Sequence, residues 1–295
     1  MKHLQTYRFI RTIARTGSIR SAAELLNITP SALTRRVLDF EDELGTAIFE
    51  RIPQGVRLNA AGLMLLRYIN DQLADFDQLR SEITSLANTQ SGHVELACSQ
   101  AFIGNFVPDQ IAVFRRSNPG ITFNVSVRDH ADGVKALANF DADLALLLDP
   151  PHSTDLSILH SSTESLCAVM NSEHPLAAKE RISLRECCKW PFAMPVSSLA
   201  IRATLNEGLV RQQLSPVIAV ESGSLEFLFN YIVREPLLTF QIAMGVPELR
   251  SGLCVRQINS DETKPMRIVL AKLKNRAVSP AAQKFAGHLC DVLDG

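Results

Sequence analysis

Apolar side chains near the start of the chain recur every three or four residues, the spacing that places them on one face of an α-helix. Residues 4 to about 16 form one such segment, with the apolar positions Leu4, Tyr7, Phe9, Ile10, Ile13 and Ala14. Residues 19–26 form another, with the apolar positions Ile19, Ala22, Ala23, Leu25 and Leu26. Turn-forming residues at 27–29 follow. The pattern therefore predicts two helices and a sharp turn.

A third helix is predicted to begin directly after this turn. Thr29 is a favoured N-cap residue, and Pro30 suits the first helical position, where its missing N–H costs nothing. The inward positions are Leu33, Val37, Phe40 and Leu44, and the outward positions are Ser31, Thr34, Arg35 and Leu38. Because the small side chains of Ala22 and Ala23 let two helices cross closely, we predict a helix-turn-helix whose second helix enters the DNA major groove. An ordinary helical hairpin is the alternative.

Residues 47–58 have the pattern of a β-hairpin. Residues 47–49 and 56–58 are the predicted strands, and Pro53-Gln54-Gly55 is the predicted turn. Arg51 and Arg57 flank this turn, where a cationic side chain can reach a DNA phosphate or the minor groove. We therefore expect a wing beside the helix pair, with a solvated charged hairpin as the alternative.

Residues 60 to about 87 contain no proline and only one glycine, Gly62, which favours a single long helix. Its apolar residues alternate at three and four positions, with Arg80 as an interruption, and form the seam Leu66, Ile69, Leu73, Phe76, Ile83 and Ala87. This seam predicts pairing with the same helix of a second copy, and hence a dimer. Packing of the helix on its own downstream domain is the alternative.

Strands and helices alternate after a predicted hinge at residues 88–92. The predicted strands are residues 93–98, 121–127, 144–148, 166–170, 192–194, 217–220, 237–239 and 266–273, and the predicted helices are residues 102–116, 133–139, 225–234 and 280–293. This alternation predicts a parallel sheet covered on both faces. Because the chain crosses between two αβ units near 162–165 and 263–266, we expect a two-lobed α/β domain of the periplasmic-binding-protein kind.

Composition and charge limit the possible functions. The chain is 46% hydrophobic and 21% charged, and no apolar run is long enough for a signal peptide or a membrane span, so we expect a cytoplasmic protein without a membrane partner. The net charge is −1, but residues 1–62 hold nine Lys or Arg against six Asp or Glu, a balance of +3. That excess suits a few contacts to DNA phosphates.

No sequence motif indicates an enzyme, a metal site or a cofactor. The six cysteines form no CxxC or Cys/His cluster, so we expect reduced, buried side chains, with a redox switch as the alternative. Phosphate-binding loops, HExxH, GxSxG and Cys/His/Asp arrangements are missing from the sequence, and we assign no catalytic residue. His174, within His174-Pro175-Leu176-Ala177, is expected to cap a loop.

The N-terminal segment resembles the DNA-binding domain of LysR-type transcriptional regulators. The matching motifs are Phe9, Gly17-Ser18, Ala22-Ala23-Glu24, Ser31-Ala32-Leu33-Thr34-Arg35, residues 41–45, Ile48-Phe49-Glu50-Arg51, Arg57-Leu58 and Ala61-Gly62. Further along, Asn118-Pro119-Gly120, Asp141-Ala142-Asp143-Leu144 and the His174 motif resemble elements of the family's effector domain. Pro30 replaces the usual Gln and Asn59 replaces the usual Thr; the first departure indicates an atypical target sequence.

This resemblance implies three segments and three kinds of partner. Residues 1–59 would form an all-α winged helix-turn-helix unit, residues 60–88 a linker and dimerisation helix, and residues 89–295 the effector domain, with lobe 1 at about 92–162 and 266–295 and lobe 2 at about 163–265. The implied partners are double-stranded DNA with a pseudo-palindromic site, a small-molecule effector, and further copies in a homodimer or homotetramer. The predicted DNA contacts are Ser18, Ser31, Thr34, Arg35, Arg36, Arg51 and Arg57.

A ligand is expected where strands of the two lobes end. Ser99-Gln100-Ala101-Phe102 combines a hydroxyl, an amide and a helix start, which suits an anion. The predicted ligand contacts are Ser99, Gln100, Phe102, Arg128, Ser197, Ser222 and Thr239, with Asp129, Ser198 and Glu221 beside them. For each of these residues, a helix cap or a solvated loop position is the alternative. We therefore expect a transcriptional regulator that senses an organic anion, with a solute receptor as the competing function.

Overall fold

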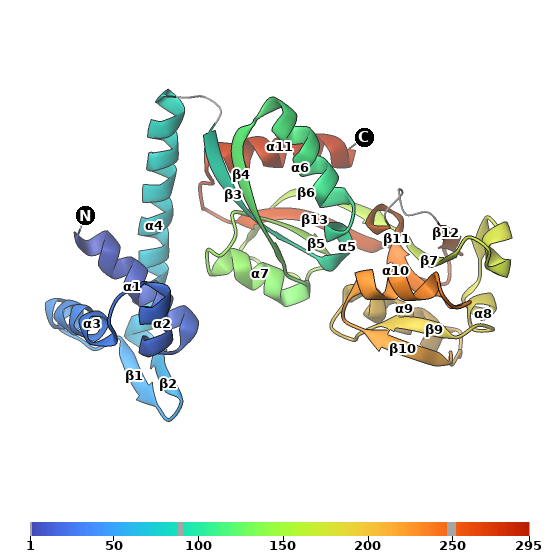
Figure 1. Ribbon diagram of the computed structural model, residues 1–295, viewed down its shortest axis with the longest axis horizontal. Helices are drawn as coiled ribbons and strands as arrows, with labels where there is room; N and C mark the ends of the chain where they lie inside the picture. The colour runs from blue at the N-terminus through green and yellow to red at the C-terminus, as the bar shows by residue number, and fades with distance from the viewer. Residues whose placement is uncertain (1, 88–90, 247–251, 295) are drawn as a thin grey trace. The chain divides into compact units, whose positions relative to one another are not determined.

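The computed structural model describes residues 2–87, 91–246 and 252–294 (Figure 1). The chain divides into two compact units, Met1–Ile83 and Thr84–Gly295. Within the described ranges, no helix is both long enough and apolar enough to cross a membrane.

Three helices and a hairpin build the first unit, and a long helix follows them. The elements are α1 (Lys2–Thr16), α2 (Ile19–Leu25), α3 (Pro30–Leu44), β1 (Phe49–Ile52), β2 (Gly55–Leu58) and α4 (Ala60–Ala87). The predicted helices are confirmed to within a few residues. Their shared core is Phe9, Ile13, Ala22, Ala23, Leu33 and Val37. Two predicted inward residues are wrong: Leu25 is 60% exposed and Leu44 is 44% exposed. Each is the last residue of its helix, beyond the crossing point where the helices pack.

The hairpin begins later than the sequence pattern predicts. Strands β1 and β2 pair antiparallel from Phe49↔Leu58 to Ile52↔Gly55, which leaves Pro53 and Gln54 as the loop. Ile48 is fully buried instead. The N–H groups of Ile48 and Phe49 donate to Oε1 of Glu41, at 2.7 and 3.1 Å. Ile48 is therefore held by α3, and residues 47 and 48 do not extend the wing.

The apolar residues of α4 lie on two different faces of the helix. Ile69 and Leu73 are buried in a cluster with Ile10, Phe40 and Ile48, within the first unit itself. The prediction that they face a second copy is therefore wrong. The large apolar side chains that remain exposed on the described part of α4 are Leu63, Met64, Tyr68, Leu79 and Ile83. Thus α4 packs on its own unit along one face and leaves a different apolar face in solvent.

One lobe of the second unit is built on a five-stranded sheet in the order β4-β3-β5-β13-β6. Its strands are β3 (Ser91–Cys98), β4 (Gly120–Val127), β5 (Leu144–Leu148), β6 (Leu156–Glu164) and β13 (Met266–Leu273). Strand β3 is parallel to β4 and β5, whereas β13 is antiparallel to β5 and β6. The predicted all-parallel sheet is therefore wrong at this edge, because β13 enters from the other lobe against the direction of its neighbours. The sequence pattern also missed β6.

Helices cover both faces of this sheet, as predicted. The helices are α5 (Gln100–Ile103), α6 (Phe106–Ser117), α7 (His130–Ala138) and α11 (Pro280–Asp294). Figure 1 shows α6 and α11 on one face and α7 on the other. Strand alternation agrees with this arrangement: Leu146 joins the core that contains Phe114 and Phe285, while Leu147 joins the core that contains Leu137.

Two boundaries in this lobe differ from the prediction. The single helix expected at residues 102–116 is two helices, because α5 ends at its C-cap Gly104 before α6 begins. The expected hinge lies partly outside the described residues, at 88–90. Its last two residues, Ser91 and Gly92, belong to β3, where they pair with Gly120 and Ile121 of β4.

The other lobe contains a four-stranded sheet, β11-β7-β12-β8, and a parallel pair, β10-β9. Its strands are β7 (Leu166–Asn171), β8 (Arg181–Ile182), β9 (Phe192–Pro195), β10 (Ile218–Ser222), β11 (Thr239–Ile242) and β12 (Leu253–Ile258). Its helical segments are η1 (Pro175–Ala178), α8 (Leu184–Cys187), α9 (Ala200–Arg211), α10 (Leu225–Ile232) and η2 (Ala243–Gly245). The sequence pattern missed α9 and β12. The chain passes between the lobes from β6 to β7 and from β12 to β13, at the predicted crossings.

Candidate functional site

The outward face of α3 is held in place by caps and by the wing. Thr29 Oγ1 accepts a hydrogen bond from the Ala32 N–H at 3.3 Å, with Pro30 in the first turn, as the sequence predicts. Ser18 caps α2 in the same way, through Ser21. The Val56 N–H donates to the carbonyl of Gly17 at 2.9 Å, which ties strand β2 to the α1–α2 turn. Local caps, this backbone hydrogen bond and the contacts of Glu41 with the N–H groups of Ile48 and Phe49 therefore set the helix pair and wing relative to each other.

Most predicted DNA contacts lie on the surface of the first unit. Ser31 and Arg35 are exposed on α3, opposite its buried face, and Arg36 is exposed at the flank of that face. Thr34 is half-buried, and its hydroxyl donates to the Pro30 carbonyl at 2.8 Å. Its remaining outward groups are therefore lone pairs of the hydroxyl oxygen and a methyl group. Ser18 is half-buried because it serves as the α2 cap.

The two wing arginines differ in their charge environment. Arg57 pairs with Glu50 on the neighbouring strand, directly across the ladder. Arg51 is exposed and lies opposite Val56. The positive charge of Arg57 is thus partly neutralised within the hairpin, whereas Arg51 has an uncharged cross-strand neighbour.

In the second unit, Ser99 is buried, at 2% exposure, and joins three strand ends. Its Oγ accepts a hydrogen bond from the Leu148 N–H at 3.0 Å and its hydroxyl is hydrogen-bonded to the Asp129 carboxylate. It makes no side-chain cap to α5. The hydroxyl thus already donates and accepts inside the protein, and a ligand contact at Ser99 stays a prediction.

Gln100 connects the two lobes. Its backbone N–H donates to Asp129 Oδ1 at 3.0 Å. Its side-chain amide donates to the Gly223 carbonyl at 2.8 Å and accepts from the Leu225 N–H at 2.5 Å, at the start of α10. Burial raises the pKa of the Asp129 carboxyl, and the hydrogen bonds from Gln100 and Ser99 oppose that rise. The position expected for a ligand anion thus already contains a carboxylate of the chain.

The remaining predicted ligand residues divide between core and surface. Phe102 is fully buried and packs edge-on against Phe106, and Thr239 is fully buried within β11. Phe102 belongs to the core of its lobe, whereas the Thr239 hydroxyl is buried without a hydrogen-bond partner among the described residues, so a ligand contact at either residue stays a prediction. Ser197 is exposed. Ser222 is half-buried and accepts a hydrogen bond from the Ser224 N–H at 3.1 Å.

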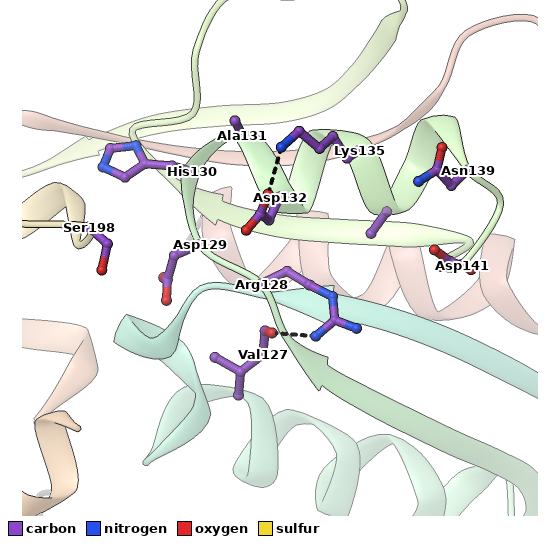
Figure 2. Close-up of a pocket in the computed structure, with 11 residues that line it drawn as sticks. Val127, Arg128, Asp129, His130, Ala131, Asp132, Lys135, Asn139, Asp141 and Ser198 are labelled. Atoms are coloured by element: carbon purple, nitrogen blue, oxygen red, sulfur yellow. Dashed lines mark hydrogen bonds and ion pairs between the residues drawn. The ribbon is translucent and has the colours of Figure 1, made fainter. Parts of the chain in front are cut away.

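A pocket of about 620 Å³ lies beside α7 (Figure 2). It is lined by Val127, Arg128, Asp129, His130, Ala131, Asp132, Lys135, Ala136, Asn139, Asp141 and Ser198. Figure 2 shows the Asp129 carboxylate between Ser198 and Arg128. Lys135 pairs with Asp132 at 2.9 Å, whereas Arg128 Nη1 donates to the Val127 carbonyl at 2.9 Å. Of the predicted ligand residues, the pocket includes Arg128 alone.

Sequence reasoning missed His130, Asp132 and Lys135 as pocket residues. A usable signal was present, because the polar run at residues 128–132 directly follows strand β4. His130 also has a left-handed backbone, with φ of 46°. A positive φ is uncommon in residues other than glycine, so the backbone at the β4–α7 junction has an unusual conformation.

Comparison with known proteins decides the family. The model of the LysR substrate binding domain matches residues 87–294, and that of the bacterial regulatory helix-turn-helix protein of the lysR family matches residues 4–63. The chain belongs to the LysR family. It is therefore a DNA-binding transcriptional regulator with a domain for a small-molecule effector.

Relatives of this LysR regulator span its length. It is 26% identical over 288 residues to the uncharacterized regulator YybE of Bacillus subtilis, covering 95% of this chain and 96% of YybE. It is 28% identical to the transcriptional activator CmpR of Synechocystis over 224 residues, covering 76% and 73%.

Solved structures share its fold. Full-length CbnR in complex with its target DNA has a TM-score of 0.64 at 16% identity, covering 97% of this chain and 98% of CbnR. The effector-binding domain of QuiR in complex with shikimate has a TM-score of 0.57 at 19% identity, covering 68% and 97%.

His174 of this LysR regulator has a structural role, as its sequence motif predicts. It is buried, its Nδ1 accepts a hydrogen bond from the Leu176 N–H at 3.2 Å, and its ring packs edge-on against Trp190 with centroids 4.5 Å apart. Burial lowers the pKa of its imidazole. A neutral ring that accepts from the backbone is a loop cap.

The cysteines are free thiols in the structure. Burial raises the pKa of Cys98 to about 12 and that of Cys167 to about 11. Such thiols are poor nucleophiles, because the reactive form is the thiolate. Among the described residues, no cluster of three His, Cys, Asp or Glu side chains is placed to hold a metal ion.

Proposed function

We propose that this regulator places α3 in the major groove of double-stranded DNA, with Ser31, Thr34 and Arg35 facing bases or phosphates. The observation that carries the proposal is the division of α3 into two faces: Leu33, Val37 and Phe40 are buried, while Ser31, Arg35 and Leu38 are exposed on the side away from the core. Ser18, Arg36, Arg51 and Arg57 are then placed to contact the backbone on either side of the groove.

Selection from a random duplex library, followed by affinity measurements at several salt concentrations, tests this proposal. Wild type is expected to enrich one sequence, with affinity that falls as salt rises. We expect Arg35→Ala to weaken binding to all duplexes and to reduce the slope of log affinity against log salt by about 1. Arg116→Ala, an exposed arginine on α6, is the matched control. Equal binding by the Arg35→Ala variant would remove Arg35 from the interface.

The DNA-binding form is proposed to be a dimer that pairs through α4, with two dimers forming a tetramer. Met64 is 74% exposed, and Tyr68, Leu79 and Ile83 are each more than half exposed on this helix. A surface of that kind is typical of helices that pair. Sedimentation of Met64→Glu and Leu79→Glu is expected to give monomers. Leu25→Glu, at an exposed position of α2, is expected to sediment like wild type.

The effector is proposed to be an organic anion that binds in the pocket beside α7, with its acidic group on Arg128. Arg128 supports this proposal, because its guanidinium donates to the uncharged carbonyl of Val127, whereas Lys135 is paired with Asp132. Calorimetric titration with a panel of small carboxylates and their amides tests it. Carboxylates are expected to bind wild type at least tenfold more tightly than Arg128→Gln, with Arg116→Gln unchanged. Equal affinity for both would place the acid elsewhere.

We further propose that this regulator works in the cytoplasm and acts by binding rather than by turnover. Its domain composition supports both points, since each matched domain is a binding module. A carboxylate that binds in the titration is expected to be recovered chemically unchanged after long incubation with the protein.

A further inference from the structure

Leu38 occupies a central place on the outward face of α3. It lies one turn after Thr34 and Arg35 and two turns after Ser31, so all four share one side of the helix. Its side chain is 52% exposed, while Leu33, Val37 and Phe40 on the opposite side are buried. An apolar side chain therefore stands in the middle of the surface proposed to enter the major groove.

The surroundings of Leu38 do not form a surface for another protein. Arg35, Asp39 and Asp42 are exposed beside it on the same helix. A single leucine ringed by charged and polar groups is much smaller than the apolar patches typical of protein contacts. A group that fits this single exposed leucine is itself a small apolar group surrounded by polar atoms.

Thr34 adds a second apolar group next to Leu38. Its hydroxyl hydrogen is used on the Pro30 carbonyl at 2.8 Å, within the helix. The hydroxyl therefore cannot donate to a base without breaking that bond. Toward a base, Thr34 presents its methyl group and an acceptor oxygen, one turn before Leu38.

The major groove offers one apolar group, the 5-methyl of thymine; the other base-edge groups are hydrogen-bond donors and acceptors. Leu38 has no donor or acceptor, so it cannot distinguish the remaining edges. From this match we infer that Leu38, aided by the Thr34 methyl, recognises thymine methyl groups in each half-site. The inference rests on the proposed insertion of α3 into the major groove.

The test begins with the duplex that wild type selects from a random library. Each thymine in its half-sites is replaced in turn by uracil, which removes only the methyl group. At one or two positions, uracil is expected to weaken wild-type binding about three- to tenfold. Leu38→Ala is expected to weaken binding to the thymine duplex by a similar factor and to show little further loss on uracil. Leu25→Ala, which truncates another leucine that is more than half exposed, on α2, is expected to keep the full preference for thymine.

Three results would overturn the inference. One is equal wild-type affinity for thymine and uracil at every position. Another is that Leu38→Ala keeps both the affinity of wild type and its full preference for thymine. A third is that Leu38→Ala binds the thymine and uracil duplexes more weakly than wild type by the same factor, which would assign Leu38 to a protein contact. If wild type selects no DNA sequence from the library, both the proposed insertion of α3 into the groove and this inference are overturned. If wild type selects a sequence but removal of thymine methyl groups has no effect, only this inference is overturned.

Discussion

The side-chain amide of Gln100 and the backbone N–H of Leu225 are joined by a 2.5 Å hydrogen bond across 125 positions of sequence. The same amide donates to the Gly223 carbonyl at 2.8 Å. One side chain of the five-stranded lobe thus satisfies both a donor and an acceptor at the start of α10 in the other lobe. Because the pocket includes Asp129 and Ser198, one from each lobe, this contact affects how the pocket walls are held.

Replacing Gln100 by Glu is expected to release this contact. A carboxylate can still accept from Leu225, but it has lost the donor to Gly223 and places negative charge against that carbonyl. We expect backbone amides at residues 223–228 to exchange hydrogen at least tenfold faster in Gln100→Glu. Hydrogen exchange read by mass spectrometry measures this. Gln283→Glu, at an exposed position on α11, is the control. Unchanged exchange would mean that the contact does not hold α10.

Ser99→Ala is expected to destabilise the effector domain rather than remove a ligand contact. The substitution leaves the buried Leu148 N–H without its partner at 3.0 Å, which costs about 1–3 kcal/mol. Urea unfolding should detect this loss. Ser197→Ala, at an exposed position, should change the free energy of unfolding by less than about 0.5 kcal/mol. A Ser99→Ala domain as stable as wild type would contradict the structural role.

Two glycine substitutions are expected to act in opposite directions. A Cβ at Gly62 would lie 2.2 Å from the carbonyl oxygen of Ile48, a backbone atom that cannot move away freely. We expect Gly62→Ala to destabilise the first unit by about 1–3 kcal/mol. A Cβ at Gly287, within α11, would meet nothing within 4 Å. Gly287→Ala should therefore stabilise the effector domain by up to about 1 kcal/mol, through helix propensity. Thermal unfolding followed by circular dichroism compares both with wild type.

The stability of the effector domain is expected to fall below about pH 6.5 because of His174. Burial lowers the pKa of its imidazole in the folded state, so the unfolded chain, with a pKa near ~6.5, takes up the proton first. Stability then increases with pH up to that value and is lost as pH decreases. Protonation also removes the acceptor for the Leu176 N–H. Unfolding curves between pH 5 and 8 should show this slope in wild type and a smaller one in His174→Ala. Identical slopes would exclude His174 as the cause.

Much of the first unit was predictable because its signals are local. Thr29 and Pro30 set the start of α3, and Gly45, with φ of 74°, ends it. Caps and helical periodicity act over a few residues, so they can be recognised without knowing the rest of the fold. The exposed groups on α3 follow from the same periodicity. The failures occur at helix ends, as with Leu44, where neighbouring elements decide burial.

The sequence by itself determined the helix-turn-helix, the wing and the alternation of strands and helices, because each depends on contacts between residues near one another in the chain. Tertiary structure alone decided that Ile69 and Leu73 of α4 pack in their own unit. It also decided that the Ser99 hydroxyl meets the Leu148 N–H and the Asp129 carboxylate. These partners lie tens of residues apart, and strand order and packing bring them together. A sequence shows which groups can hydrogen-bond or be buried, whereas only the packed fold determines which partner each group meets.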